Sequence, residues 1–267
     1  MPAPPSPRAP FGGLSLKRLR LLAAQVLLGV VLLGVWQALA MTGALDEFFF
    51  SRPSAVAARV AEWVRTGFIW PHLGLTMAEA ALAFTLGAGA GAISGFALAR
   101  MPGVGAVLDP YIRILNALPR VVLAPIFLLW FGLGLWSKVA LGITVVFFIV
   151  FFNTHRGVRE VDPVLVNNVR MLGATNWQLS RHVLIPSALT WVFSSLQTSV
   201  GFAMIGVVVG EYLGSTGGVG YVISQAEGVF DTTGVFAGIT VLSAAVLLVG
   251  WGVSRLERWL LRWKEPA

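Results

Sequence analysis

Long apolar runs separated by short clusters of charge dominate the pattern along this chain. Six windows of at least 17 residues contain no Asp, Glu, Lys or Arg: 21–45, 80–99, 121–137, 139–155, 182–210 and 232–254. A helix needs about 20 residues to cross about 30 Å of hydrocarbon, and its flanks can tilt or snorkel. The window at 121–136 is apolar all round, unlike an amphipathic helix of a soluble core. The pattern therefore predicts an all-α membrane protein with six transmembrane helices.

These windows also predict how the chain is divided. Residues 1–19 form a basic, Pro-rich tail, and residues 20–267 form one membrane domain. The apolar run that starts at Leu21 ends in Ala-Leu-Ala, which resembles a signal-peptidase site, but it exceeds the ~7–15 residues of a secretory signal. We interpret it as an uncleaved span. We expect a long loop at about 156–189 and spans at about 21–43, 73–99, 118–136, 138–155, 190–213 and 233–255.

Composition and charge agree with a membrane location. Hydrophobic residues make up 57% of the chain and charged residues only 12%, where a soluble domain has about 25%. Fifteen of the 19 Lys and Arg residues fall in the two tails and the even-numbered connections. The positive-inside rule then places both termini in the cytoplasm. The net charge of +7 is explained by anionic lipid headgroups, so we expect the lipid bilayer as a partner and no nucleic acid.

Motifs for catalysis or metal binding are missing from the sequence. There is no cysteine, the three histidines are far apart, and neither His-Glu-x-x-His nor Gly-x-Ser-x-Gly occurs. The Gly-rich stretch 214–220 lacks the lysine of a P-loop, so we interpret it as a flexible connection or hinge. We therefore expect no catalytic residue, no metal site and no cofactor bound by this chain, and no enzyme activity of its own.

Small residues and prolines predict how the spans pack. Glycines recur every four residues in the second and fifth spans, and such rows let helix backbones approach closely in lipid. The rows are Gly87, Gly91 and Gly95, and Gly206, Gly210 and Gly214. Packing within one chain is the favoured interpretation, with a subunit interface as the alternative. Pro119 and Pro125 should kink the third span or break it into two pieces.

A short amphipathic helix is predicted after the first span. Apolar residues recur at helical spacing between residues 56 and 64, which favours a helix lying on the outer face. The apolar positions are Val56, Val60, Trp63 and Val64, and the positions expected to face water are Arg59, Glu62 and Arg65. Interfacial packing is the favoured role, and contact with an external partner protein is the alternative.

Four residues are candidates for lining a translocation path. Glu79 lies about two turns into the second span, where a carboxylate is a functional candidate unless it reaches water at the outer end. Gln197 and Met204 lie two turns apart on the fifth span, where interhelical hydrogen bonding is an alternative role for Gln197. Glu211, on the outer side, completes the set.

Two short helices joined by a glycine turn are predicted in the long loop. Asp162 followed by Pro163 is a helix start, and Gly173 ends that helix. Thr175 with Gln178 forms a capping box that opens a second helix, which we expect to end near Pro186. The apolar faces are Leu165, Val169 and Leu172 on the first helix and Leu179 and Val183 on the second. The pair is either a surface hairpin or a docking element for a soluble partner.

The same loop resembles the cytoplasmic loop of ABC importer permeases. The family pattern is Glu-Ala-Ala, three residues, Gly, nine residues, Ile-x-Leu-Pro. Here Gly173 is followed after nine residues by Val183-Leu184-Ile185-Pro186, whereas Asn167-Asn168-Val169 replaces Glu-Ala-Ala. Further stretches resemble the sulfonate, taurine, nitrate and pyrimidine-precursor branch, in the same order from about residue 50 onward. They include Leu129-Trp130-Phe131-Gly132, Val161-Asp162-Pro163 and Gly217-Gly218-Val219-Gly220-Tyr221.

The resemblance implies a type I ABC importer permease in the plasma (inner) membrane of a bacterium. Its partners would be a second, identical permease, two cytoplasmic ATPases that bind ATP and Mg, and an external substrate-binding protein. The loop would supply the coupling helix, with Leu172, Gly173, Ala174, Thr175, Asn176 and Trp177 contacting the ATPase. The solute would be of sulfonate, taurine, nitrate or pyrimidine-precursor type. A self-sufficient secondary transporter and a non-transporting membrane scaffold are the alternatives.

Overall fold

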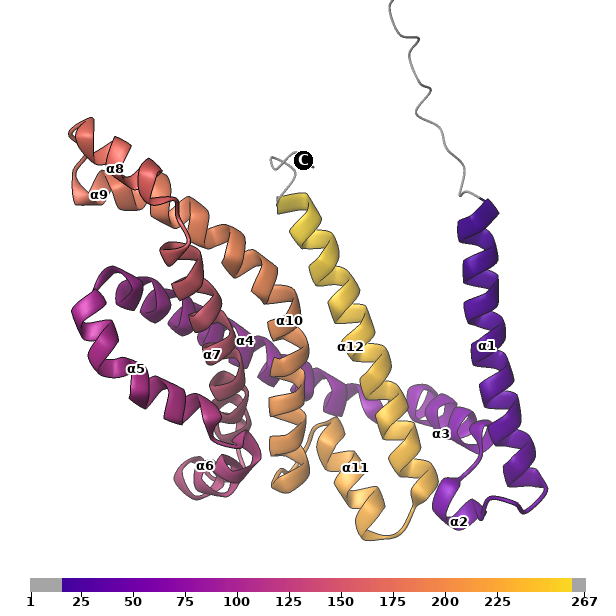
Figure 1. The fold of residues 1–267 in the computed structure, drawn as a ribbon. Coiled ribbons are helices and arrows are strands. Elements are labelled where there is room, and N and C mark those ends of the chain that lie inside the picture. Colours follow the sequence, from indigo (N-terminus) through magenta and orange to yellow (C-terminus); the bar gives the residue numbers. More distant parts are fainter. Residues whose placement is uncertain (1–15, 261–267) are drawn as a thin grey trace, which may run out of the picture.

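The computed structural model describes residues 16–260, with side-chain surroundings for 19–255, and every regular element in that part of the chain is a helix (Figure 1). The first half comprises α1 (Leu16–Met41), α2 (Glu47–Phe50), α3 (Pro53–Thr66), α4 (Ile69–Arg100), α5 (Pro102–Ala117), the 3₁₀ turn η1 (Arg120–Leu123) and α6 (Ala124–Phe131). The second half comprises α7 (Leu135–Arg159), α8 (Pro163–Met171), α9 (Asn176–Leu179), the π turn η2 (Ser180–Leu184), α10 (Ile185–Leu213), α11 (Val219–Gly228) and α12 (Thr232–Leu260). Residues 1–15 of the predicted tail lie outside the described residues.

Five helices in the described residues are long and apolar enough to cross a membrane, namely α1, α4, α7, the continuous helix from α9 to α10, and α12. The sixth predicted span, at about 118–136, is not one helix. Its residues belong to η1, α6 and the start of α7, and α5 with η1–α6 forms a pair bent by 89°. Pro119 begins this break and Pro125 lies in the first turn of α6, so the prediction of a broken span is confirmed. The piece before the break, α5, was not predicted.

Helix α7 is the centre of the bundle and packs between α4 and α10. A Cβ added at Gly91 would lie 2.5 Å from the carbonyl oxygen of Phe147, and one at Gly95 would lie 2.6 Å from that of Phe151. On the other side, a Cβ at Gly206 would lie 2.8 Å from the Cα of Gly142. The two glycine rows therefore bring helices of one chain into backbone contact, as the favoured prediction had it.

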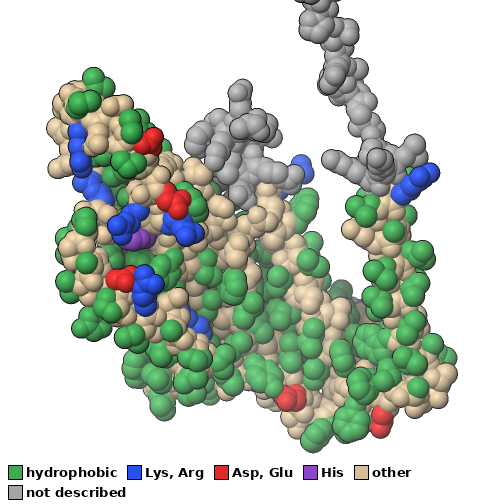
Figure 2. Space-filling model, in the orientation of Figure 1, with side chains coloured by type: hydrophobic (Ala, Val, Ile, Leu, Met, Phe, Trp, Pro, Cys, Tyr) green, Lys and Arg blue, Asp and Glu red, His purple; other side chains and the backbone are tan. Residues whose placement is uncertain are grey.

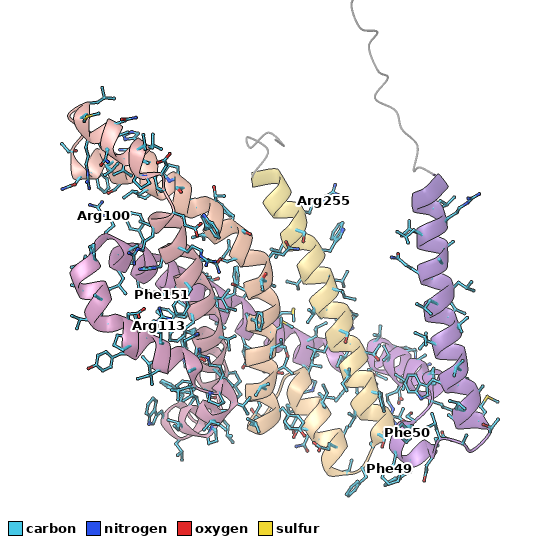
Figure 3. All side chains as sticks on the ribbon, viewed as in Figure 1. Phe49, Phe50, Arg100, Arg113, Phe151 and Arg255 are labelled. Carbon is cyan, nitrogen blue, oxygen red and sulfur yellow. The ribbon has the colours of Figure 1, made fainter. Side chains whose placement is uncertain are left out.

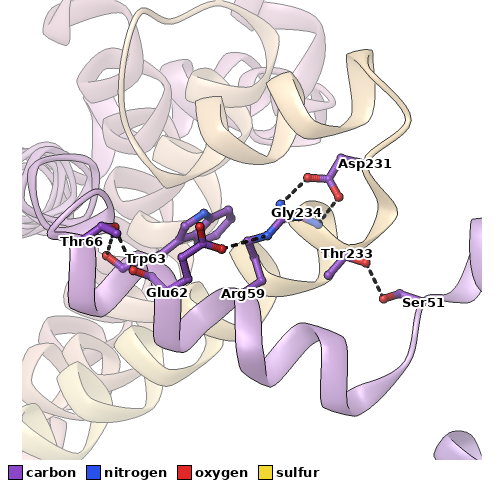
Figure 4. A network of polar contacts seen from close by, with 8 residues as sticks. All are labelled: Ser51, Arg59, Glu62, Trp63, Thr66, Asp231, Thr233 and Gly234. Atoms are coloured by element: carbon purple, nitrogen blue, oxygen red, sulfur yellow. Dashed lines mark hydrogen bonds and ion pairs between the residues drawn. The ribbon is translucent and has the colours of Figure 1, made fainter.

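The amphipathic helix α3 packs mainly against α12 (Figure 4). Val56 is buried, and Val60 and Trp63 pack on the adjoining core, so most of the predicted apolar face is confirmed. Arg59, predicted to face water, is instead half-buried. Its Nη1 lies 2.5 Å from Oδ2 of Asp231, because the loop between α11 and α12 passes beside α3 and supplies a carboxylate.

The two ends of the bundle differ in character. The start of α1, the end of α12 and the α8–α9 hairpin lie at the same end (Figure 1). Blue Lys and Arg side chains gather at that end around the hairpin, whereas hydrophobic side chains cover most of the face below (Figure 2). Helix α1 stands apart, and the apolar window that qualifies it as a span has none of its residues buried. An apolar helix so exposed in one chain requires lipid or other protein around it.

Candidate functional site

The α8–α9 hairpin has the caps that its sequence predicts. Oδ1 of Asp162 accepts the N–H of Val164 at 2.7 Å, and Gly173 ends α8 with a left-handed φ of +83°. At the start of α9 the Thr175 N–H donates to Oε1 of Gln178 at 2.8 Å, and the N–H of Gln178 donates to Oγ1 of Thr175 at 3.3 Å. These bonds satisfy helix-end groups and fix the turn through residues close in sequence.

The tip of the hairpin exposes apolar side chains. Met171 is 80% exposed, Leu172 87% and Trp177 67%. Helix α8 packs on the bundle through Val166 and Val169. The predicted face of Leu165, Val169 and Leu172 is therefore wrong for Leu165 and Leu172, which are exposed. The half-buried face of α8 is instead formed by Val166 and Val169. Together with Val161 before the helix, they pack against Leu179 and Leu184. Exposed Leu, Met and Trp side chains at a polar, basic end are typical of a protein contact.

The hairpin continues directly into a membrane helix. Asn176 to Leu213 form one helix of 38 residues, so the prediction that the second helix ends near Pro186 is wrong. A proline inside a helix lacks an N–H and clashes with the preceding turn. At Pro186 the preceding turn is the wider π turn η2, which makes room for the proline ring. The N–H of Ile185 accordingly bonds to the carbonyl of Ser180. Arg100 at the end of α4 also holds the hairpin, through a 3.3 Å bond to the carbonyl of Asn176.

A buried charged cluster lies at the opposite end of the bundle. Glu79 of α4, Lys138 of α7 and Glu211 of α10 are each 1% exposed. The ammonium group of Lys138 donates to the carbonyls of Leu133 and, at 2.9 Å, Gly134. Both carboxylates interact with Lys138 and with each other, and Oε2 of Glu79 has no hydrogen-bond partner among the described residues. Burying three ionisable groups in an apolar bundle is costly, so such groups generally have a structural or functional role.

Glu211 of the cluster, together with His72 and Thr76 of α4, binds the Gly-rich loop between α10 and α11. Three successive N–H groups of the loop donate to side chains: Gly218 to Nδ1 of His72 at 3.2 Å, Val219 to Oγ1 of Thr76 at 2.9 Å and Gly220 to Oε2 of Glu211 at 2.7 Å. Oγ1 of Thr76 donates in turn to Oε1 of Glu211 at 2.6 Å. The predicted flexible hinge is thus a loop whose backbone is tied to α4 and α10.

The four path candidates do not form one surface in this chain. Glu79 and Glu211 meet in the buried cluster, and Met204 is buried in the core beside it. Gln197 is exposed further along α10, and its Nε2 donates to Oγ of Ser254 on α12 at 2.9 Å. Sequence reasoning missed Lys138, Thr76 and His72. Lys138 could have been found in the sequence, because it is the only charged residue between the apolar windows 121–137 and 139–155. A single charge between two such windows favours a residue inside the membrane over one in a connection.

These features define a multi-pass membrane protein with a protruding hairpin whose tip exposes apolar side chains. Residues 85–262 match the family described as binding-protein-dependent transport system inner membrane component, and the chain belongs to that family. It is therefore the permease component of an ABC importer and an inner-membrane protein, and the predicted family is confirmed. Members of this family work within a transporter complex, and its permeases are not themselves catalytic.

Individual relatives differ in the solute that their names give. The chain is 34% identical, over 90% of its length and 87% of the relative, to the putative aliphatic sulfonates transport permease protein SsuC of Bacillus subtilis. It is 33% identical, over 88% of each chain, to the riboflavin transport system permease protein RibX of Chloroflexus aurantiacus. An inward-facing structure of the MetNI methionine ABC transporter matches with a TM-score of 0.59 and 18% identity, over 74% of this chain and 96% of that one. This likeness shows the fold.

Proposed function

We propose that two copies of this chain form the membrane path of an ATP-driven importer for a sulfonate-type solute. Two ATPase subunits bind on the hairpin side, which is cytoplasmic, and carry ATP and Mg. A substrate-binding protein delivers the solute to the opposite side. The basic end of the bundle and the family's description support this arrangement. The relative named for aliphatic sulfonates supports the solute class.

The observation that carries the proposal is the apolar tip of the hairpin. Trp177 is exposed in the first turn of the 38-residue helix that carries Glu211 near its other end, and Met171 and Leu172 are exposed just before that helix. A partner that binds the tip therefore holds one end of a rigid rod, and the other end of the rod carries the buried cluster. Movement of the ATPases is transmitted along this rod to the side that receives the solute.

Replacing Gly173 tests the docking role. A valine resists the left-handed backbone, so Gly173→Val should disturb the turn, weaken ATPase binding and abolish stimulated ATP hydrolysis while insertion stays normal. Gly67→Val is the matched control. Gly67 also ends a helix with φ +81°, and neither glycine has an atom within 4 Å of an added Cβ, but Gly67 follows α3, away from the hairpin. A Gly173→Val protein that couples as well as Gly67→Val contradicts the proposal.

Removing an aromatic side chain from the tip gives a second test. Trp177→Ala should weaken ATPase binding through lost contact area, since aromatic residues dominate interface energies. Trp130→Ala is the control, because Trp130 is 70% exposed on α6 and Trp177 67% exposed at the hairpin. Pull-down of the ATPase from membranes that contain each variant at equal levels measures the difference. Equal recovery with the two variants would refute a contact at Trp177.

The assembly and its solute need separate measurements. Native mass spectrometry of the co-expressed complex should show two permeases with two ATPases. Proteoliposomes that contain this complex and its binding protein should accumulate taurine or an alkanesulfonate only with ATP. Accumulation by the permease alone, without an ATPase, would favour a secondary transporter.

A further inference from the structure

A cavity beneath the hairpin has no role in the proposed coupling. It measures about 520 Å³ and lies between the end of α4, helix α5 and the last turns of α7. Figure 2 shows Lys and Arg side chains gathered around a histidine on this part of the surface, with acidic side chains among them. In Figure 3, Arg113 of α5 and Phe151 of α7 lie close to each other, with Arg100 nearer the hairpin.

The lining of the cavity has an apolar part and a basic part. Leu98, Ile112 and Phe151 belong to the apolar part, and Arg113, His155 and Arg159 to the polar part. Phe151 is buried and stacks on the ring of His155, with centroids 6.0 Å apart and planes 15° apart. The imidazole is thereby held at the boundary between the two parts.

Charges in the cavity leave an excess of positive charge. The only carboxylate that lines it, Asp109, is paired with Arg113 at 2.7 Å. Among the described residues, no carboxylate lies within ion-pair distance of Arg159. An adjoining hollow of about 360 Å³ shares Phe152 and His155 and adds Arg156, which pairs with Glu160 at 3.2 Å. Arg159 is thus the charge that a bound anion would neutralise.

We infer that this cavity binds an amphiphilic oxyanion, with its phosphate or sulfonate head at Arg159 and His155 and its apolar part against Phe151 and Leu98. Arg presents several N–H donors that match the oxygens of such a head. Basic pockets between membrane helices on the cytoplasmic side bind anionic lipid headgroups. Two sources supply this chemistry: an anionic phospholipid of the bilayer, and a free sulfonate-like solute, the latter resting on the proposed function.

Binding is tested on the full chain in nanodiscs. The assay needs neither the ATPase nor transport, so its result can be interpreted even if the proposed function is wrong. One arm measures retention of phosphatidylglycerol against phosphatidylcholine by native mass spectrometry. The other arm measures binding of octanesulfonate by calorimetry in phosphatidylcholine nanodiscs. Retention of phosphatidylglycerol supports a lipid site, and binding of octanesulfonate alone supports a site for a free anion.

Three variants make the test specific to the cavity. Arg159→Gln should weaken binding about tenfold or more, because a hydrogen bond to a charged group contributes about 1.5–3 kcal/mol. Asp109→Asn should tighten binding, since it releases Arg113 from its carboxylate. Arg65→Gln, at an exposed residue of α3 outside the cavity, should have no effect. The inference is overturned if neither probe binds, or if Arg159→Gln binds as tightly as Arg65→Gln.

Discussion

At the scale of single residues, the buried cluster is the most demanding feature of the chain. Two carboxyl groups and one ammonium group are removed from water: Glu211 accepts the hydroxyl of Thr76 on α4, and Lys138 donates to the carbonyl of Gly134 at the start of its own helix. Lys138 is the only basic member, so its loss leaves Glu79 and Glu211 facing each other without a counter-charge. Leaving a buried charge without its counter-charge costs about 3–5 kcal/mol, whereas neutralising both sides costs much less.

Lys138→Met should therefore lower the free energy of unfolding by about 3–5 kcal/mol. Adding Glu211→Gln to that variant should restore part of the loss, because one uncompensated carboxylate is removed. Thermal unfolding of the detergent-solubilised protein, followed by tryptophan fluorescence, measures both variants. A single variant as stable as the parent would show that the cluster does not hold α4, α7 and α10 together.

The Arg59–Asp231 pair gives a dependence of stability on pH (Figure 4). Burial raises the pKa of Asp231, but the Gly234 N–H and the Arg59 guanidinium outweigh burial, so the pKa lies below its ordinary value. A lowered folded-state pKa stabilises the protein above the unfolded pKa of about 3.9, and this stabilisation is lost as pH falls through the folded pKa.

Asp231→Asn should thus reduce stability at pH 7 by about 0.5–1 kcal/mol, a modest value because the pair is partly exposed. It should also remove part of the loss of stability of the parent protein below about pH 4. Unfolding temperatures measured from pH 7 to pH 3 provide the comparison, with Glu62→Gln as a control at the more exposed partner of Arg59. Parallel pH curves for Asp231→Asn and the parent would contradict this account.

At the scale of elements, local signals predicted well and long-range packing did not. The caps at Asp162, Gly173 and Thr175 depend on bonds within a few residues, so sequence alone located them. Which face of α8 is buried depends on where the bundle lies, and periodicity could not choose between Leu165 and Val166. A charge between two apolar windows looks like the end of a span, which is why Lys138, at the start of the span expected at about 138–155, was not among the candidates.

The Gly-rich loop between α10 and α11 provides a prediction at this scale. Gly218 has φ +100°, and an added Cβ would lie 2.1 Å from Oε1 of Glu211. Gly218→Ala should therefore lower the stability of the protein in two ways. It strains the backbone, and it displaces the carboxylate that accepts the N–H of Gly220. Gly67→Ala imposes a similar backbone strain in open space, so we expect Gly218→Ala to be less stable by a further ~1–3 kcal/mol. Equal stability of the two variants would mean that the loop can move away from Glu211.

At the scale of the whole molecule, one helix joins the two ends of the bundle. The 38 residues from Asn176 to Leu213 extend about 57 Å at ~1.5 Å per residue, which exceeds the thickness of the hydrocarbon core. The exposed hairpin is at one end, and Glu211 with the tied loop is at the other. The glycine rows do not support the expected dimer, since they are used for packing within the chain. The second copy in the proposed complex would therefore be bound through other surfaces.

Gln197 lies midway along this helix and tests whether α10 lines the path. It is exposed, and it is the one path candidate that is not buried inside the chain. The chain contains no cysteine, so Gln197→Cys introduces a single thiol. A thiol reacts as its thiolate, which forms in water and not in lipid, so a residue in an aqueous path should react with a membrane-impermeant reagent. Val200→Cys, at a buried position on the same helix, should not react.

We expect the reaction of Gln197→Cys to depend on the state of the transporter. If α10 lines an alternating path, labelling in the intact complex should change severalfold between nucleotide-free and ATP-trapped states. A structural role predicts something different, because the bond from Gln197 to Ser254 would then tie α10 to α12 in both states. A Gln197→Cys thiol that stays unreactive in every state, in a complex that still transports, would assign this residue to helix packing and direct the search for the path to another face.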